Sequence, residues 1–357
     1  MLSVPIICTI FFLFPITIDP KGGLWYNLLT NIDGMYLHFG MDVALCLRKK
    51  ALLINNPCAG INRKRISPAE IMKKLSSANF DFTVQSTKGP NDATEIVKEM
   101  GNSHDIILCC GGDGTLNETI NGVLLLEKRV PVGYIPSGST NDLATTLGIE
   151  RGVDHAAQMI LNNKTNTYDV GLFKNRFFNY IATFGAATEL SYNTPQKWKN
   201  LLGHSAYMIH GFGIKLVPMI KNFKPTFMKV EYDGGVIEDN VYFGAISNTT
   251  SVAGLAKYDD VKLNDGVFEL LLVKGLKRNI DALGILNKVI HKDYSSEHII
   301  FTKTKHLKIT CDEKIPWSLD GEFGGEHGDV DIGIVPDAYD IYSDNKALFV
   351  EKAPLLV

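Results

Sequence analysis

Three glycines and one aspartate stand between an apolar run and an amphipathic pattern in the first third of this 357-residue chain. The run Ile106–Cys110 has the length and composition of a buried parallel strand. It leads into Gly111-Gly112-Asp113-Gly114-Thr115-Leu116-Asn117, and the amphipathic pattern continues through Leu126. Thr115 and Glu118 have the spacing of a capping box, which predicts a helix that starts at Thr115. A strand, a glycine turn and a helix N-terminus bring free backbone N–H groups together, so this segment is suited to bind phosphate.

Asp113 is the most informative residue of this loop. A carboxylate inside a phosphate-binding turn repels the ligand unless a cation lies between them, and the usual cation is the Mg²⁺ that accompanies a nucleoside triphosphate. The alternative interpretation is an ordinary glycine turn with a solvated acid. The combination of an acid with three glycines behind a buried strand favours the nucleotide interpretation.

Two further polar turns follow apolar strands. In the turn at residues 136–142, Ser139 and Thr140 offer hydroxyl groups to a phosphate, and Asn141 or Asp142 could hold a metal-bound water or simply cap the next helix. In the turn at residues 55–60, Asn56 could contact the ribose or base of a nucleotide, or the segment could be a plain turn held by a proline. The basic run 63–65 suits polyphosphate or anionic lipid, although such a run is often only solvated.

Two carboxylates in the second half of the chain could act as a general base. Asp320 and Glu322 flank a glycine directly after an apolar strand, an arrangement suited to taking a proton from an alcohol. An Asp-Gly turn between two strands would produce the same pattern. Asp265-Gly266 carries the same ambiguity, because a hairpin turn explains it without a metal.

Alternating strands and helices position the first group of loops. From Lys49 to about residue 164, four apolar strands alternate with helices, which predicts a doubly wound parallel sheet with ligands beyond the carboxyl ends of its strands. Residues 165–336 then show short strands with period-two character, a helical stretch at 195–220 and a helix at 278–291, which predicts an antiparallel sheet or β-sandwich. Residues 337–357 are expected to pack back on the first domain. The expected fold is therefore α/β plus β, with the active site in a cleft between two domains.

Composition limits the classes of function. The net charge of −3 and pI of about 6.3 give no overall attraction to nucleic acid or anionic lipid. Six cysteines without a CxxC pair indicate a reducing, cytoplasmic compartment and no structural metal cluster. Residues 1–48 begin with an apolar run broken by two prolines and show no periodicity; we interpret them as a leader, a disordered tail or an upstream extension.

Four segments together resemble the soluble bacterial diacylglycerol kinase family, whose catalytic domain also occurs in eukaryotic diacylglycerol, sphingosine and ceramide kinases. They are Asn56-Pro57-Cys58-Ala59-Gly60, Gly111–Thr115, Gly138-Ser139-Thr140-Asn141-Asp142 and Leu319-Asp320-Gly321-Glu322, in the family's order and rough spacing from about Lys49 onward. Ala59 stands where many relatives have serine, and Ser139-Thr140 replaces the commoner threonine-first order.

This resemblance implies roles for particular residues. The nucleotide contacts would be Asn56, Thr87, Gly111, Gly112, Asp113, Gly114, Thr115, Leu116, Asn117, Ser139, Asn141 and Asp142. Asp113, with Asp142, would organise the catalytic Mg²⁺ through water, and Asp320 or Glu322 would accept the proton of the lipid hydroxyl. The resemblance also implies a second, structural cation at Asp265, held with the carbonyl groups of Lys262 and Val267.

The expected activity is phosphoryl transfer from ATP to the hydroxyl of a diacylglycerol-like lipid, which gives phosphatidic acid. Such a kinase would be cytoplasmic and peripherally bound to the inner face of the membrane, through the cluster at 63–65 and Lys197 and Lys199; a homodimer is compatible with this expectation, and nucleic acid is not a partner. One alternative is an NAD kinase-like enzyme that shares the glycine-aspartate loop. Another is a nucleotide-binding regulator without turnover.

Overall fold

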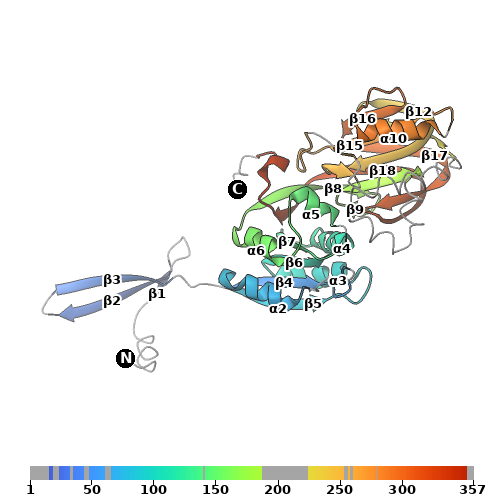
Figure 1. Cartoon of the computed structure of the whole chain (residues 1–357). Coiled ribbons are helices and arrows are strands. Elements are labelled where there is room, and N and C mark those ends of the chain that lie inside the picture. The colour runs from blue at the N-terminus through green and yellow to red at the C-terminus, as the bar shows by residue number, and fades with distance from the viewer. Residues whose placement is uncertain are drawn as a thin grey trace. The chain divides into compact units, whose positions relative to one another are not determined.

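The computed structural model describes residues 48–60, 66–139, 141–186, 224–252, 256–257, 260–278 and 280–351, together with the backbone of three upstream strands. The chain forms two compact units, Met1–Arg48 and Lys49–Val357 (Figure 1). In the first unit, β1 (Ile16–Ile18), β2 (Leu24–Ile32) and β3 (Met35–Val43) form an antiparallel sheet that the aperiodic sequence did not predict. All candidate site residues belong to the second unit.

The second unit opens with a four-stranded parallel sheet. Its strands are β4 (Lys49–Asn55), β5 (Phe80–Ser86), β6 (Ile106–Gly111) and β7 (Val132–Pro136), in the order β7-β6-β4-β5. Every residue of β6 and β7 is buried, which is the expected pattern for parallel strands covered on both faces. The apolar runs 51–55, 80–86, 106–110 and 130–135 predict these four strands, each within two residues of its observed start, and the pattern at 92–100 predicts the helix between β5 and β6.

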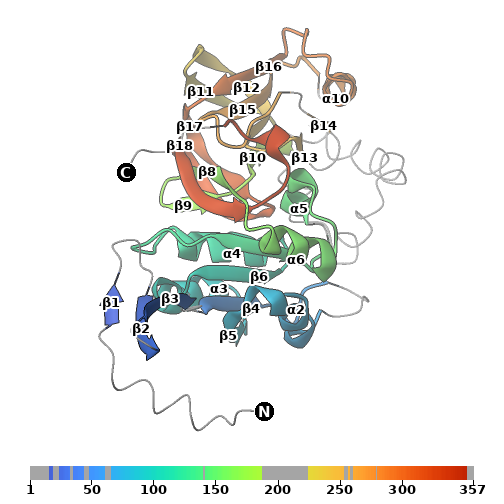
Figure 2. The same cartoon turned by 90° about the vertical axis from the view of Figure 1, so that its left-hand side faces the viewer.

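Five helices accompany this sheet (Figures 1 and 2). They are α2 (Pro68–Lys74), α3 (Asp92–Met100), α4 (Asp113–Val123), α5 (Asp142–Leu147) and α6 (Val153–Leu161). Because β5 lies on one side of β4 while β6 and β7 lie on the other, right-handed crossovers place α2 on one face and α3 and α4 on the opposite face. The packing of α3 on α4 and of α2 on α6 agrees with this arrangement.

The expected start of α4 at a capping box was wrong. The helix begins at Asp113, two residues earlier, and Gly112 is its N-cap. The side chains expected to form the box have other partners: the Thr115 hydroxyl accepts a hydrogen bond from Asn56, and the Glu118 carboxylate accepts from the backbone of Asn91 and Ala93. Contacts with distant segments therefore replace the local cap.

The C-terminal half is largely β. Its longer strands are β8 (Thr165–Phe173), β9 (Arg176–Phe178), β10 (Ile181–Gly185), β11 (Thr226–Tyr232), β12 (Gly235–Ser247), β15 (Phe268–Lys274), β16 (Ile299–Thr304), β17 (His306–Leu319) and β18 (Glu322–Tyr342). These strands pair antiparallel and enclose a second core around Trp317 and Phe268. Two short strands, β13 (Ser251–Val252) and β14 (Ala256–Lys257), pair with each other, and α10 (Asp281–Ile290) connects β15 to β16. The helical stretch predicted at 195–220 lies outside the described residues.

Strand β18 joins the two halves. Its long antiparallel ladder runs along β17 and β8, and near its end Ile341 pairs in parallel with Val132 of β7. An ion pair between Arg129 and Asp340, 2.7 Å long, reinforces this junction. After β18 the chain makes a short 3-10 helix, η3 (Lys346–Leu348). One continuous sheet thus holds the parallel and antiparallel halves in register, so that side chains from each can meet (Figure 2).

Candidate active site

Three loops meet at the carboxyl ends of β4, β6 and β7, where glycine alone fits. A Cβ added to Gly138 would lie 2.4 Å from the Cα of Gly112, so these two loops touch backbone to backbone. Gly60 has φ +79°, and a Cβ there would lie 2.6 Å from the carbonyl oxygen of Ser137. The glycines found in the sequence are therefore required by close approach of the three loops, and they leave backbone amides accessible to a phosphate.

Hydrogen bonds hold the same loops in place. The Asn56 side-chain amide donates to the Thr115 hydroxyl at 2.8 Å, and the Asn56 carbonyl oxygen atom Oδ1 accepts from the Cys58 backbone at 2.9 Å. The Thr87 N–H donates to the Asn55 carbonyl at 2.9 Å, which ties the end of β5 to the end of β4. A Cβ on Gly111 would meet Thr115 at 2.5 Å, so this glycine allows the first turn of α4 to fold against β6.

Asp113 and Asp142 form an acidic pair at the N-termini of α4 and α5. The Asp113 carboxylate accepts from the Leu143 N–H at 3.4 Å, and burial raises its pKa. Burial and then the charge of Asp113 raise the pKa of Asp142 to about 6, with a further contribution from Asp320. Because the charge of Asp113 disfavours the ionised form of Asp142, a cation beside the two carboxylates would stabilise them, so the pair fits the Mg²⁺ of a nucleotide. No group of three protein ligands forms within the described part of the chain, so phosphate and water would supply the remaining ligands.

Two of the expected nucleotide contacts, Asn141 and Leu116, have side chains engaged elsewhere, and the backbone of a third, Ser139, has a partner of its own. Asn141 is buried with φ +55°; it donates to the Gly138 carbonyl and accepts from the Tyr134 hydroxyl, so its side chain shapes the loop. It makes no side-chain cap to α5. The Leu116 side chain packs in the core, and the Ser139 carbonyl accepts from Arg151. Thr140 lies outside the described residues.

Asp320 is held rigidly in the turn between β17 and β18. It is 6 % exposed with φ +50°. Its Oδ1 accepts from the backbone N–H groups of Tyr180 and Ile181, each at 3.0 Å, and its Oδ2 accepts from Asn179 N–H at 2.7 Å and from the Asn117 amide at 2.5 Å. Burial raises the pKa of this carboxyl, while the four donors act in the opposite direction. Both of its oxygens are engaged in positioning α4 against β10.

Glu322 occupies a different environment two residues later. A Cβ on Gly114 would lie 2.9 Å from its Oε1, so the carboxylate lies directly against the first turn of α4. Its side chain is 50 % exposed and pairs with Arg176 at 3.2 Å, and Arg176 also donates to the Phe323 carbonyl at 2.9 Å. Arg176 was missed in the sequence because it lies at the β8–β9 hairpin, where nothing in the local pattern points to Glu322. Asn117, Asp320 and Glu322 are thus brought to one place from opposite halves.

The cation site expected at Asp265 has a lysine at its edge. Asp265 Oδ2 lies 3.0 Å from the Lys303 ammonium, and Oδ1 accepts from the Val267 N–H at 3.4 Å. The Lys262 ammonium donates to the Ala347 carbonyl at 2.5 Å. The expectation that Asp265, Lys262 and Val267 bind a cation therefore stays a prediction.

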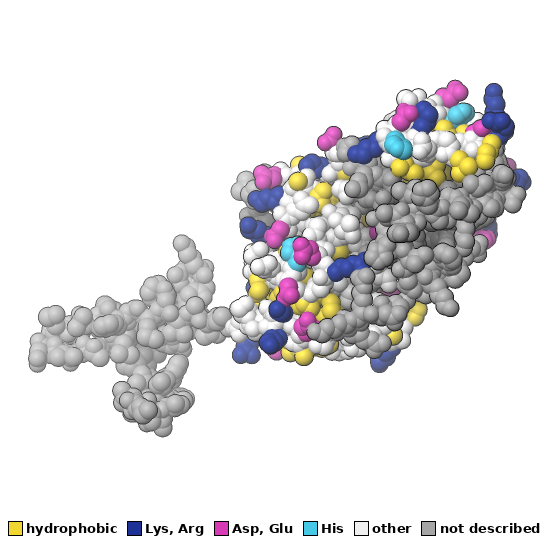
Figure 3. Space-filling view, in the orientation of Figure 1, with side chains coloured by type: hydrophobic (Ala, Val, Ile, Leu, Met, Phe, Trp, Pro, Cys, Tyr) yellow, Lys and Arg dark blue, Asp and Glu magenta, His cyan; other side chains and the backbone are white. Residues whose placement is uncertain are grey.

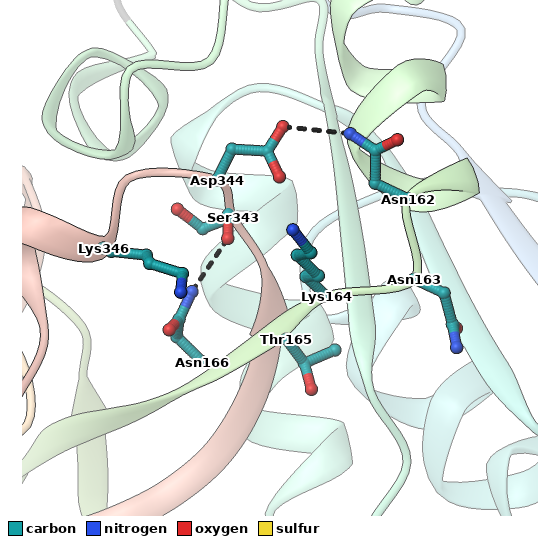
Figure 4. A pocket seen from close by; sticks show the side chains of 8 residues that line it. All are labelled: Asn162, Asn163, Lys164, Thr165, Asn166, Ser343, Asp344 and Lys346. Carbon is teal, nitrogen blue, oxygen red and sulfur yellow. Dashed lines mark hydrogen bonds between the residues drawn. The ribbon is translucent and has the colours of Figure 1, made fainter. Parts of the chain in front are cut away.

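A cavity of about 670 Å³ lies away from these loops (Figure 4). Asn162, Thr165 and Asp344 are among the residues lining it, and Asn162 donates to Asp344 at 3.3 Å. It sits near the amino-terminal end of β7, where β18 ends, whereas the glycine loops follow the carboxyl ends of the strands. The cavity is therefore separate from the candidate active site.

Two sets of basic residues were expected to contact the membrane. The basic cluster 63–65 and Lys197 and Lys199 lie outside the described residues. On the face drawn in Figure 3, basic and acidic side chains of described residues are interspersed. No helix among the described residues is both long and apolar enough to cross a bilayer.

Comparison with known proteins points to one family. The family model of the diacylglycerol kinase catalytic domain matches residues 50–173. The chain is 34 % identical to the diacylglycerol kinase of Bacillus subtilis over 78 % of its own length and 91 % of that protein, and 32 % identical to a Staphylococcus aureus diacylglycerol kinase over 78 % and 88 %. A crystal structure of a putative diacylglycerol kinase from Bacillus anthracis superposes with a TM-score of 0.68 at 26 % identity, covering 84 % of this chain and 98 % of that one.

The chain combines a mixed α/β half with a largely β half, and its family model and its curated relatives are those of a lipid kinase. The chain belongs to the diacylglycerol kinase family. Kinases of this family use ATP, and the three glycine loops of this chain are suited to its phosphates.

Proposed function

We propose that this chain transfers the γ-phosphoryl group of ATP to the hydroxyl of diacylglycerol, which gives phosphatidic acid and ADP. The substrate class follows from the relatives, which are named for it. The observation that carries the proposal is the position of Glu322, a carboxylate of the C-terminal half, against the first turn of the phosphate-binding helix at Gly114. In this arrangement Glu322 would be a proton acceptor beside the transferred group.

The proposal keeps the domain plan expected from the sequence. Residues 49–164 would form the ATP-binding domain, residues 165–336 a β-sandwich that accepts the lipid, and residues 337–357 a segment that returns to the first domain, with the reaction in a cleft between the domains. Asp113 and Asp142 would hold Mg²⁺ together with phosphate oxygens and water, and the ion would neutralise charge on the phosphates. Access to lipid would require peripheral contact with the cytoplasmic face of the membrane.

The geometry favours Glu322 over Asp320 as the general base. The four hydrogen bonds of Asp320 occupy both of its oxygens and would have to break for it to accept a proton from substrate. Glu322 is half exposed and faces the loop. The lipid oxygen would attack the γ-phosphorus, the bond to the β-phosphate oxygen would break, ADP would leave and the hydroxyl proton would pass to Glu322.

The test is transfer of labelled phosphate from ATP to diacylglycerol, ceramide and sphingoid bases in mixed micelles, with NAD as a soluble acceptor. We expect phosphatidic acid as the main product. A preference for another lipid would redirect the substrate assignment within lipid kinases. Transfer only to NAD would support the NAD kinase-like alternative, and ATP binding without any transfer would support a regulator.

Two isosteric variants separate the roles of the carboxylates. Glu322→Gln should keep the melting temperature and ATP affinity of the wild type while kcat falls by about 10²- to 10⁴-fold, the usual contribution of a general base. Asp320→Asn should lower both the melting temperature and kcat, because its amide would face backbone N–H donors. Unchanged kcat in Glu322→Gln would remove Glu322 from the reaction.

A further inference from the structure

A buried carboxylate outside the active site depends on a single lysine. Glu269 of β15 is 2 % exposed, and neither of its carboxylate oxygens has a hydrogen-bond partner among the described residues. Among the described side chains, the Lys303 ammonium lies 3.7 Å from Oε1. An ionised carboxylate in such surroundings is costly unless a positive charge lies beside it.

The same ammonium has two hydrogen-bond acceptors besides its ion pair with Glu269. Lys303 Nζ lies 3.0 Å from Asp265 Oδ2 and donates to the Asp260 carbonyl at 3.3 Å, in addition to its pairing with Glu269. Glu269 and Lys303 are directly opposite each other in the antiparallel β15–β16 ladder. The register of the two strands therefore places the lysine beside the carboxylate. Asp260 and Asp265 belong to the loop that precedes β15. The lysine therefore connects that loop to both strands.

This cluster coincides with the position where a structural cation was expected. Oxygen ligands around a divalent ion would need carboxylate oxygens that are available to it. Here one Asp265 oxygen faces the ammonium and the other faces the Val267 N–H. We infer that the Lys303 ammonium takes the place of that cation and neutralises Asp265 and Glu269, so that the loop before β15 is held without a bound metal. The inference concerns folding, and it stands whether or not the proposed lipid substrate is correct.

The full chain without nucleotide provides the test, with the melting temperature and metal content as measurements. Wild type should melt at the same temperature in chelator and in millimolar Mg²⁺ or Ca²⁺, and should retain no divalent metal after gel filtration. Lys303→Met should lower the melting temperature by about 5 °C in chelator, because a buried carboxylate loses its counter-charge. Lys98→Met is the matched control, since its partner Glu95 is exposed and the pair should contribute little.

A second substitution keeps the test decisive. In the Lys303→Met background, Glu269→Gln should restore most of the lost melting temperature. Burial raises the pKa of Glu269 to about 8 even beside the Lys303 charge, and glutamine replaces this carboxyl with a group that cannot ionise. Mg²⁺ or Ca²⁺ should also raise the melting temperature of Lys303→Met while leaving that of wild type unchanged. A chelator-sensitive wild type that retains a divalent ion would overturn the inference. So would a Lys303→Met protein that melts like Lys98→Met.

Discussion

The side-chain amide of Asn117 donates to the Asp320 carboxylate at 2.5 Å across 203 positions of the sequence. Asn117 lies on α4, whose N-terminus faces the glycine loops, and Asp320 lies in the turn that also carries Glu322. This bond therefore sets the position of the proposed base relative to α4, the helix proposed to bind phosphate. Because both residues are buried, the contact is shielded from water.

Removal of this amide should affect stability and catalysis together. We expect Asn117→Ala to lower the free energy of unfolding by about 1–3 kcal/mol, because Asp320 loses one of its donors in a buried site. The value of kcat should fall at the same time, since Glu322 is no longer fixed beside α4. Urea denaturation and steady-state kinetics measure the two effects.

The control for that variant is Asn162→Ala, which removes an exposed Asn–Asp hydrogen bond to Asp344 of 3.3 Å. It should leave both quantities close to those of wild type. If Asn117→Ala behaved like this control, the contact would have no part in positioning the site.

Contact between the glycine loops should make them intolerant of a single methyl group. In Gly138→Ala the new Cβ would lie 2.4 Å from Gly112 Cα, so the loops must separate. We expect ATP affinity to fall at least about tenfold, because the backbone amides lose their alignment with the phosphates. Isothermal titration with ATP and Mg²⁺ measures this change.

Gly284→Ala is the appropriate comparison for the loop variant. Nothing lies within 4 Å of a Cβ at this position, which is inside α10. Alanine should stabilise that helix by about 0.5–1 kcal/mol without any effect on ATP affinity. Equal ATP affinity in the two variants would show that the close loop contact is not needed for binding.

The acidic pair at the two helix N-termini should make stability depend on pH. The pKa of Asp142 is raised from 3.8 to about 6 in the folded chain, so the folded state binds this proton more tightly than the unfolded state. The resulting stabilisation is complete below about pH 4 and is lost as the pH rises through about 6. Without Mg²⁺ and nucleotide, we expect the melting temperature of wild type to fall between about pH 5 and pH 7 more steeply than that of Asp142→Asn.

Mg²⁺ with a non-hydrolysable ATP analogue should flatten this pH dependence, because a cation near the pair favours its ionised form. Parallel melting curves for wild type and Asp142→Asn in the absence of ligand would show that Asp142 titrates normally.

Local sequence was sufficient for the elements around the phosphate-binding loops. The apolar composition of β6 and β7, the turn residues and the proline at the start of α2 are properties of neighbouring residues, and the predicted α3 and β5 have the observed bounds. The glycines around Asp113 signalled close backbone approach because only glycine allows it. The four motifs in order were enough to indicate the family.

Long-range contacts decided the rest. The capping box failed because Thr115 and Glu118 are hydrogen-bonded to segments 59 and up to 27 positions away, which local spacing does not reveal. Asp320 and Glu322 look equivalent in the sequence, yet φ of +50° at Asp320 turns one carboxylate into the protein and leaves the other at the helix, where Arg176 meets it. The sequence determines which chemical groups the side chains carry. The hydrogen bonds that distinguish Asp320 from Glu322 form only after the strands have paired, and the same pairing brings Lys303 beside Glu269.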